Sequence, residues 1–322
     1  MTVNRASALL LATLCWSTAS AQDYPTRPIT IIVPFAAGGP SDVLARNLSS
    51  TMSATLKQQM IIENVGGAVT LGIARAARAQ PDGYTVLVTH VGIATAPFLY
   101  RRLPYDTIND FEPIGRVADV PMTLVAKKTL PPNNLNDFID YAKANRDKLT
   151  YGHAGAGSSS HLCGLLFMSA IGTEFTTVPY KGNAPVMNDL LGGQIDFTCD
   201  QTTNTTQQIN GGTVKVYGVT SKTRVPSLPQ LPTLDEQGMT GFEVVIWYGL
   251  WAPKGTPKAA LDKLNGALRT AVQDQTFNSR MADLGAFPAP LANAAPEPLR
   301  AHLKSEIETW GPIIKKAGIQ PE

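Results

Sequence analysis

Short apolar runs alternate with amphipathic stretches along most of the chain, and this pattern predicts strands that alternate with helices. The first series is an apolar strand at Ile29–Val33, a helix at Ser41–Leu56, a strand at Met60–Glu63, a helix at Thr70–Arg78 and a strand at Thr85–Thr89. Alternating strands and helices are typical of a mainly parallel sheet that is covered by helices on both faces. We therefore expect an α/β lobe that begins near the N-terminus.

A second series of elements indicates a second sheet. Its expected elements are the strand Met122–Lys127, the helix Asn136–Asn145, the strand Leu149–Gly152, a helix that opens near Ser158, the strand Thr176–Pro179, the helix Ala184–Gly192, and the strands Ile195–Cys199 and Lys215–Thr220. A strand at Val244–Ala252 is long enough to return to the first sheet. Three helices are then expected at Lys258–Gln273, Thr276–Leu284 and Pro298–Gly311.

The order of these elements predicts two lobes joined by more than one chain crossing. A chain of 322 residues is longer than a single core usually supports. We expect lobe 1 to consist of residues 22–121 and 250–322, and lobe 2 of residues 122–249, with hinge crossings near residues 121 and 249. Two crossings would form a hinge rather than a flexible linker.

The first 21 residues have the pattern of a cleavable signal peptide. Arg5 supplies a basic start, Ala6–Trp16 an apolar segment, and Ala19–Ala21 a small-residue cleavage site. The apolar segment is shorter than the roughly 20 residues that span a bilayer. We expect Gln22 to begin the mature protein, in the periplasm.

Charge and cysteine content narrow the possible partners. Lys and Arg number 27 and Asp and Glu number 25, so no excess positive charge is available to hold a nucleic acid. Only Cys163 and Cys199 follow the expected signal peptide. A disulfide between them is compatible with an oxidising periplasm, but two buried free thiols are the favoured interpretation. The 4 histidines lack metal-binding spacing, so we expect no metal and no cofactor.

The first candidate site is the turn Pro34–Asp42, which leaves a buried strand and enters a helix. Open α/β sheets bind ligands at such strand ends. Gly38 and Gly39 allow the backbone to approach a ligand, Ser41 or Asp42 can cap the helix, and the free N–H groups of its first turn can bind an anion. The spacings of phosphate-cradling and dinucleotide-binding loops are absent. A purely structural glycine-rich turn is the alternative interpretation.

The second candidate site is the turn Gly152–His161, which has the same position in the inserted lobe. Only one of its three serines, Ser158, Ser159 and Ser160, is needed as an N-cap, so the others can donate to a carboxylate. His161 either packs structurally or contacts the ligand. A hydrolase is not favoured, because Ser160 and His161 are neighbours that point apart and the Gly-x-Ser-x-Gly spacing is missing.

Polar residues at other strand ends are further candidates for the cleft. They are Thr89, His90, Lys181, Asn183, Asp200, Gln201 and Thr202. Lys181 could neutralise a second carboxylate, while Phe35 and Phe98 could flank an apolar or aromatic ligand body. For each of these polar residues, a surface or capping role is the alternative.

The motifs together resemble those of the Bug-type receptors of tripartite tricarboxylate transporters. The matching segments are Tyr24–Ile29, Val33–Gly39 with Ser41–Asp42, Pro81–Thr85, Ser158–Leu162, Pro179–Gly182 and Asp189–Asp196. The resemblance implies an α/β periplasmic binding protein of type II (Venus-flytrap), which has no enzymatic activity and closes over a small carboxylate for a membrane permease. It also implies that the Phe35–Asp42 and Ser158–His161 turns hold one carboxylate between them. The segment Glu63–Thr70 departs from the family pattern, which puts an exact ligand in doubt.

The sequence therefore predicts a monomeric solute-binding protein for a carboxylate. The expected ligand is a dicarboxylate, with the aromatic acid terephthalate as the favoured example. A periplasmic sensor for a signalling protein and a secreted hydrolase are the alternatives. The expected ligand-binding residues are Phe35, Ala36, Gly38, Gly39, Ser41, Asp42, Thr89, His90, Ser158, Ser159, His161, Lys181, Asn183 and Asp200.

Overall fold

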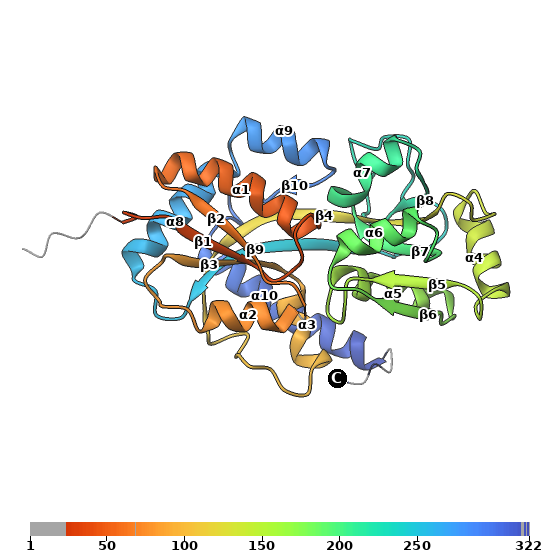
Figure 1. The fold of residues 1–322 in the computed structure, drawn as a ribbon, viewed down its shortest axis with the longest axis horizontal. Coiled ribbons are helices and arrows are strands. Elements are labelled where there is room, and N and C mark those ends of the chain that lie inside the picture. The colour runs from red at the N-terminus through yellow and green to blue at the C-terminus, as the bar shows by residue number, and fades with distance from the viewer. Residues whose placement is uncertain (1–23, 68, 317–318, 320, 322) are drawn as a thin grey trace, which may run out of the picture.

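Strands of both predicted series join into one hydrogen-bonded path that runs through two lobes (Figure 1). The computed structural model describes residues 24–67, 69–316, 319 and 321. Along the path the strand order is β2-β1-β3-β9-β4-β7-β5-β6, and β8 and β10 also pair with β4. The expected signal peptide lies outside the described residues.

The strands and helices have the following bounds. The strands are β1 (Ile29–Val33), β2 (Met60–Asn64), β3 (Thr85–His90), β4 (Phe111–Lys127), β5 (Thr150–His153), β6 (Thr176–Pro179), β7 (Phe197–Gln201), β8 (Val214–Val219), β9 (Val245–Pro253) and β10 (Phe287–Pro288). The helices are α1 (Pro40–Leu56), α2 (Val69–Ala77), α3 (Gly92–Leu99), α4 (Leu135–Ala144), α5 (Ser159–Ile171), α6 (Asn183–Leu191), α7 (Thr202–Asn210), α8 (Lys258–Ala271), α9 (Gln275–Asp283) and α10 (Pro296–Lys316).

The predicted α/β class with a mixed sheet is confirmed. Strands β1, β2 and β3 pair in parallel, as do β5, β6 and β7. Strands β4 and β9 pair antiparallel with each other. Strand β9 also pairs antiparallel with β3, and β4 with β7, so the antiparallel share is larger than the sequence pattern indicated. Helices α3 and α7 and the first part of β4 were not predicted. Figure 1 shows α1 and α9 above the strands and α2 and α3 below them.

Strands β4 and β9 carry the chain between the lobes. Residues up to Pro121 of β4 pair with β9, and from Met122 onward β4 pairs with β7 and β8. This change of partners supports the proposed crossing near residue 121. Val245, the first residue of β9, already pairs with Pro121, which favours a second crossing before residue 249. The lobe limits therefore stay a proposal, with the second limit nearer Val245.

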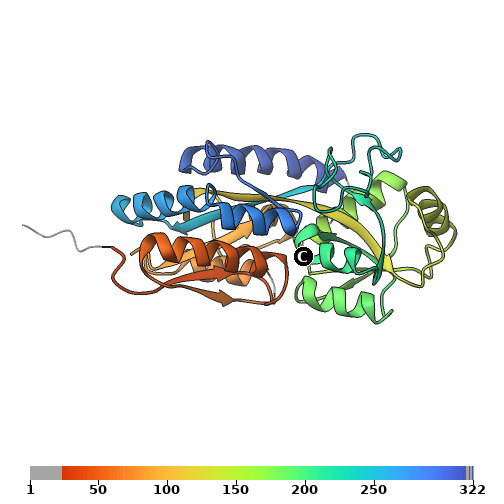
Figure 2. The same ribbon diagram turned by 90° about the horizontal axis from the view of Figure 1, so that it is seen from above.

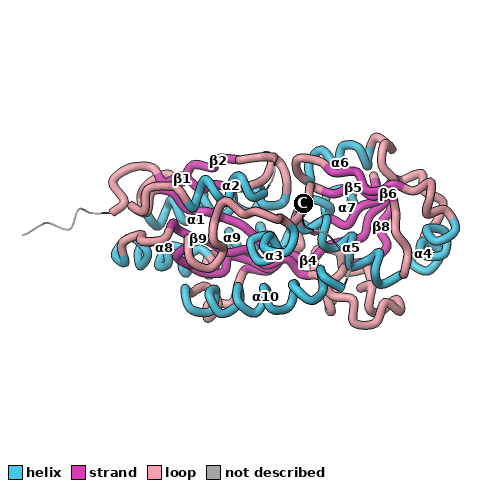
Figure 3. Tube along the Cα trace, turned by 90° about the horizontal axis from the view of Figure 1, so that it is seen from below, coloured by secondary structure: helices cyan, strands magenta, loops and turns pink. Residues whose placement is uncertain are grey.

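The C-terminal helix α10 runs along one side of the molecule from lobe 1 toward lobe 2 (Figure 3). Its residues Trp310 and Ile313 line an apolar cavity of about 200 Å³ together with Leu162 and Leu165 of α5. Helix α10 and the helix that carries the second candidate site therefore line the same cavity. None of the described helices combines the length and the apolar composition that a membrane crossing requires.

The interpretation of Cys163 and Cys199 as free thiols is wrong. The two residues form a disulfide across 36 residues of sequence, with their Cα atoms 6.0 Å apart. Cys163 lies on α5 and Cys199 on β7, and both are buried. The sequence could not show that the helix and the strand lie this close. The disulfide links helix α5, which begins at the second candidate site, to strand β7, which ends at Gln201.

Replacing Gly164 with alanine is expected to lower the free energy of unfolding by about 1–3 kcal/mol, because overpacking a buried contact forces side chains and backbone apart. A Cβ atom on Gly164 would lie 2.3 to 2.6 Å from three atoms of the buried Tyr151 side chain. Gly266 of α8 provides the matched control, since a Cβ there meets no atom within 4 Å. Gly266→Ala should stabilise slightly, as alanine favours helices. Equal effects of both variants in urea unfolding would contradict the packing argument.

Candidate ligand-binding site

The carboxyl ends of the parallel strands in the two lobes face one another across the middle of the molecule (Figure 2), and in the sequence a helix follows each of β1, β2, β3, β5, β6 and β7. The Tyr100 hydroxyl of lobe 1 donates to the carbonyl of Ala156 in lobe 2, at 2.9 Å. A Cβ atom on Gly39 of lobe 1 would lie 3.8 Å from the backbone nitrogen of Asn183 in lobe 2. The turn after β1 therefore lies against the turn after β6, and the end of α3 lies against the turn after β5.

Neither Ser41 nor Asp42 caps α1, contrary to expectation. The helix begins at Pro40 with Gly39 as N-cap, since proline is well suited to the first helical position. Asp42 instead accepts hydrogen bonds from the Gly38 amide and from Arg46, both at 2.9 Å. Burial alone would raise the pKa of Asp42, but these hydrogen bonds outweigh burial and hold the pKa below its usual value. Asp42 thus shapes the turn from within.

The three serines of the second turn have different partners. Ser158 is the N-cap of α5 and accepts from the His161 amide at 3.2 Å. The Ser160 hydroxyl accepts from the Ala154 amide at 2.9 Å and is buried. The Ser159 hydroxyl oxygen accepts from Gln201 Nε2 at 3.0 Å, which leaves its proton without an acceptor among the described residues. The hydroxyls of Ser158 and Ser160 lie 3.2 Å apart and one donates to the other, whereas Ser159 has no such neighbour, so Ser159 is well placed to donate to a ligand.

His153 and His161 stabilise this turn as neutral side chains. Their rings lie 4.7 Å apart, and their Nδ1 atoms accept from the Gly155 and Gly157 amides at 3.2 and 3.3 Å. Burial lowers the pKa of His153. Burial and the neighbouring His153 lower the pKa of His161 to about 3. A ring nitrogen that accepts cannot carry a proton, so the structure supports the packing interpretation of His161.

His90 has the same role in lobe 1. Its Nδ1 accepts from the Gly92 amide at 3.0 Å, and its ring stacks on Phe35 at 4.7 Å and meets the edge of Tyr248 at 5.5 Å. Burial lowers the pKa of His90 to about 3. His90 therefore supports Phe35 beneath the first turn as an uncharged ring.

Asp200 is a buried carboxyl group at the end of β7 without a cationic partner among the described residues. It accepts hydrogen bonds from the side-chain amides of Asn183 and Asn204 and from the backbone N–H of Gln201. Burial raises the pKa of Asp200 to about 7 in spite of these three donors. The side chain of Asn183 is thus engaged inside lobe 2, while its backbone N–H remains at the start of α6.

A chain of three hydrogen bonds connects the two turns. The hydroxyls of Ser41 and Tyr248 lie 3.0 Å apart, Tyr248 donates to Gln201 Oε1 at 2.9 Å, and Gln201 Nε2 donates to Ser159. Sequence reasoning named Gln201 only as one of several strand-end residues and missed Tyr248. The only signal for Tyr248 is its position opposite His90, which depends on the register of β3 and β9.

Backbone donors complete the junction. The N–H groups of Ser41 in α1, Ser159 in α5 and Asn183 in α6 have no acceptor within the described parts of the chain. Each belongs to the first turn of a helix, where the helix dipole favours negative charge. The arrangement can therefore bind an anion without a positively charged side chain.

The remaining predicted residues lie around the two turns. Ala36 contacts lobe 2, since a Cβ on Gly182 would lie 2.9 Å from its Cβ atom. Thr89 is buried and its hydroxyl has no partner among the described residues. Lys181 is exposed and forms no ion pair in the described structure. Phe98 does not flank the site, because its ring packs against Gly311 of α10.

The junction does not resemble a hydrolytic or metal centre. No serine hydroxyl in the described segments forms a hydrogen bond with a histidine ring, and the nearest pair in sequence, Ser160 and His161, use backbone partners. The described residues also contain no group of three or more acidic, histidine or cysteine side chains that could hold a metal ion.

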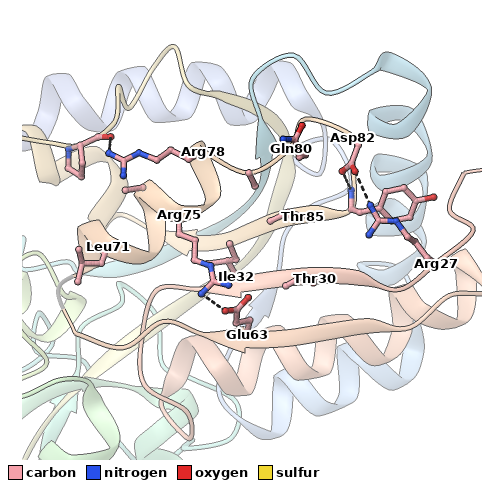
Figure 4. A pocket seen from close by; sticks show the side chains of 14 residues that line it. Arg27, Thr30, Ile32, Glu63, Leu71, Arg75, Arg78, Gln80, Asp82 and Thr85 are labelled. Carbon is pink, nitrogen blue, oxygen red and sulfur yellow. Dashed lines mark hydrogen bonds and ion pairs between the residues drawn. The ribbon is translucent and has the colours of Figure 1, made fainter.

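A large open hollow on the surface of lobe 1 is a separate feature (Figure 4). It has a volume of about 800 Å³ and includes three arginines. Arg27 pairs with Asp82 at 2.9 Å and Arg75 with Glu63 at 2.5 Å, so two of the three charges are compensated. The hollow lacks the helix N-termini that supply free amides at the junction.

Known proteins resemble the chain over nearly its full length. Residues 44–319 match the family described as "Tripartite tricarboxylate transporter family receptor". The solved periplasmic binding protein BugD shares 52% identity at a TM-score of 0.91, covering 93% of this chain and 100% of that chain. MatC from Rhodopseudomonas palustris with bound malate shares 38% identity at a TM-score of 0.87, covering 90% and 100%. A second R. palustris protein, with adipate, shares 34% identity at a TM-score of 0.89, covering 93% and 100%.

Proposed function

The chain belongs to the tripartite tricarboxylate transporter family of receptors, and we propose that it captures a small dicarboxylate and delivers it to a membrane permease. The ligand would lie between the Phe35–Asp42 turn of lobe 1 and the Ser158–His161 turn of lobe 2. The protein would act by binding alone, without turnover of the acid.

The observation that carries this proposal is the set of free donors at the junction. The Ser159 hydroxyl and the N–H groups of Ser41, Ser159 and Asn183 come from three helix starts in two lobes. Helix N-termini stabilise anions and need no metal or arginine. A carboxylate that accepts from both lobes would stabilise their closed arrangement.

A dicarboxylate is the ligand class that the relatives support, since one holds malate and another adipate. Among the aromatic side chains proposed to flank the ligand, Phe35 stacks on His90 and Phe98 packs against α10. This favours an aliphatic dicarboxylate over terephthalate, which needs an apolar surface along its ring. Lys181 is free to neutralise the second carboxylate.

Transport in the periplasm follows from the same proposal. The expected signal peptide would direct the chain there, and the monomer would close about the crossings in β4 and β9. Closure buries the ligand and gives the lobes a single surface that the permease can recognise. A receptor of this kind needs no cofactor.

Ser159→Ala is expected to weaken dicarboxylate binding about 10- to 100-fold, because a hydrogen bond to a charged group contributes about 1.5–3 kcal/mol. Titration calorimetry of the mature protein with malate, adipate and terephthalate measures the change. The most tightly bound acid should also raise the unfolding temperature, since ligand at 100 times its dissociation constant adds about 2.7 kcal/mol of stability.

Ser169→Ala is the matched control, since Ser169 lies exposed on the same helix and should leave affinity unchanged. Equal affinities of Ser159→Ala and the wild type would remove Ser159 from the site. Failure of the wild type to bind any of the three acids would contradict the proposed ligand class, and chemical conversion of a recovered acid would contradict a pure binding role.

A further inference from the structure

The hydrogen-bonded chain from Ser41 to Ser159 crosses from one lobe to the other. Ser41 belongs to α1 of lobe 1, and Tyr248 lies on β9, where it pairs with β3 and β4. Gln201 and Ser159 belong to β7 and α5 of lobe 2. The bond from Tyr248 to Gln201 is therefore a direct link between the lobes at the base of the junction.

We infer that Tyr248 and Gln201 are positioning residues that orient the hydroxyls of Ser41 and Ser159, of which only that of Ser159 donates to the ligand, while the lobes are closed. This inference rests on the proposed binding function and adds a means by which closure prepares the site. Neither residue touches the ligand in this account. Their contribution is to fix the direction in which the serine protons point.

The order of donors along the chain follows from the chemistry of each group. Gln201 Oε1 can only accept, so the Tyr248 hydroxyl must donate to it. Because the Tyr248 proton is donated to Gln201, the Ser41 hydroxyl must donate to the Tyr248 oxygen. The Ser41 proton is then not available to a ligand. At the other end, Gln201 Nε2 uses the Ser159 oxygen as acceptor and directs the Ser159 proton away from itself. Ser159 donates to the ligand, and Ser41 supports it indirectly.

Burial makes this order rigid. Tyr248 is 0% exposed and Gln201 is 1% exposed, so water cannot replace their partners while the lobes are closed. The Tyr248 ring packs edge-to-face with the His90 ring, and the backbone N–H of Gln201 donates to the Asp200 carboxyl group. These buried links favour one arrangement of the chain, and the Ser159 proton at its end is the one left for the ligand.

Opening of the lobes would separate Tyr248 from Gln201 and release both serines from their orientation. Closing would restore the chain and present the Ser159 proton to a carboxylate at the same moment. The link should therefore slow the escape of a bound ligand, because escape requires the lobes to part. It should not affect the first encounter with the open protein.

Tyr248→Phe tests the inference, because it removes only the hydroxyl. The dissociation rate of malate, measured by stopped-flow fluorescence, should rise about tenfold while the association rate stays unchanged. Small-angle scattering without added acid should show a larger radius of gyration than for the wild type. Tyr217→Phe is the matched control, as Tyr217 is a buried tyrosine of lobe 2 whose hydroxyl donates to Pro132 at 3.3 Å.

The donor order makes a second measurement decisive. Adding Ser41→Ala to Tyr248→Phe removes the Ser41 hydroxyl but keeps its N–H donor, so it should cause no further loss of malate affinity, whereas adding Ser159→Ala should cause a further loss of about tenfold or more. Gln201→Glu gives an independent route, because a carboxylate would accept the Ser159 proton and remove it from the ligand.

Three outcomes would overturn the inference. Unchanged rates and scattering in Tyr248→Phe would show that the link does not hold the lobes. An equal loss on adding Ser41→Ala or Ser159→Ala would show the wrong donor order. A structural role alone would change the unfolding temperature without the rise in dissociation rate. Absence of malate binding by the wild type would instead count against the proposed ligand, and the scattering comparison would still test the link.

Discussion

The double variant Cys163→Ala/Cys199→Ala is expected to lose about 4 kcal/mol of unfolding free energy relative to the oxidised wild type. The disulfide closes a segment of 36 residues, and closing a loop of that length restricts the unfolded chain by roughly this amount. Both cysteines are buried, so alanine also leaves a small space behind. Urea unfolding of the two proteins, followed by tryptophan fluorescence, measures the difference.

The wild type refolded in a thiol reductant is the control for this variant. It should show the same loss, while the reductant should not change the alanine variant. Cys163 lies one helical turn after Ser159, and Cys199 lies on the strand that ends at Gln201. Loss of the disulfide should therefore also loosen the Ser159–Gln201 hydrogen bond and weaken malate binding. Equal stability of the oxidised wild type and the double variant would contradict this account.

The regular part of the fold could be predicted because apolar periodicity determines it. The strand Ile29–Val33 has the predicted limits, and the helix expected at Ser41–Leu56 differs by one residue. In both elements, side chains that face the core recur at the spacing of a strand or a helix. The two-lobed α/β arrangement follows from the order of such elements.

Helix α7 shows where that signal fails. Its sequence, from Thr202 to Asn210, contains little apolar periodicity and several residues with low helix propensity. The buried face consists of threonines, and the hydroxyls of Thr202, Thr205 and Thr206 donate to backbone carbonyls. Thr202, for example, donates to the Gly285 carbonyl at 2.9 Å, and Thr206 donates to Leu284. These partners are distant in sequence, so only the assembled fold gives the helix its stability.

The candidate site was predictable to the level of its turns. A glycine-rich turn and a serine-rich turn at strand ends both predicted anion binding, and the fold brings them to one junction. The roles within each turn were not predictable. Ser158 and Ser159 are adjacent and chemically identical, and only their partners in the fold separate them: Ser158 caps α5 and lies 3.2 Å from the Ser160 hydroxyl, whereas Ser159 accepts from Gln201. Tyr248 was missed because its contact depends on the register between β9 and β3.

Acid is expected to destabilise the protein through its buried neutral histidines. The folded-state pKa values of His90 and His161 are about 3, below the usual value of 6.5. Their contribution is complete above pH 6.5 and is lost as the pH falls toward 3, because the unfolded chain then binds protons that the folded chain excludes. At pH 5 each should lose about 2 kcal/mol relative to pH 8. The lowered pKa values of His153 and His302 act in the same direction.

Asp200 opposes this loss. Its folded-state pKa of about 7 lies above the usual 3.8, so its contribution to stability is complete below pH 3.8 and is lost as the pH rises through 7. Relative to pH 8, Asp200 should restore about 3 kcal/mol at pH 5. The histidines and Asp200 therefore nearly cancel, and the wild type should lose only about 1–2 kcal/mol between pH 8 and pH 5.

Asp200→Asn should expose the histidine effect. The variant keeps the shape of the side chain but cannot titrate, so it should lose about 3 kcal/mol more than the wild type between pH 8 and pH 5. Urea unfolding at a series of pH values measures this slope. Asp196→Asn is the matched control: burial would raise the pKa of Asp196, but the Lys127 ion pair and the Thr150 hydrogen bonds hold it below 3.8. It therefore does not titrate in this range, and the wild-type slope should be kept. If Asp200→Asn shows the wild-type slope, Asp200 is already ionised at pH 5, because its three amide donors then outweigh its burial.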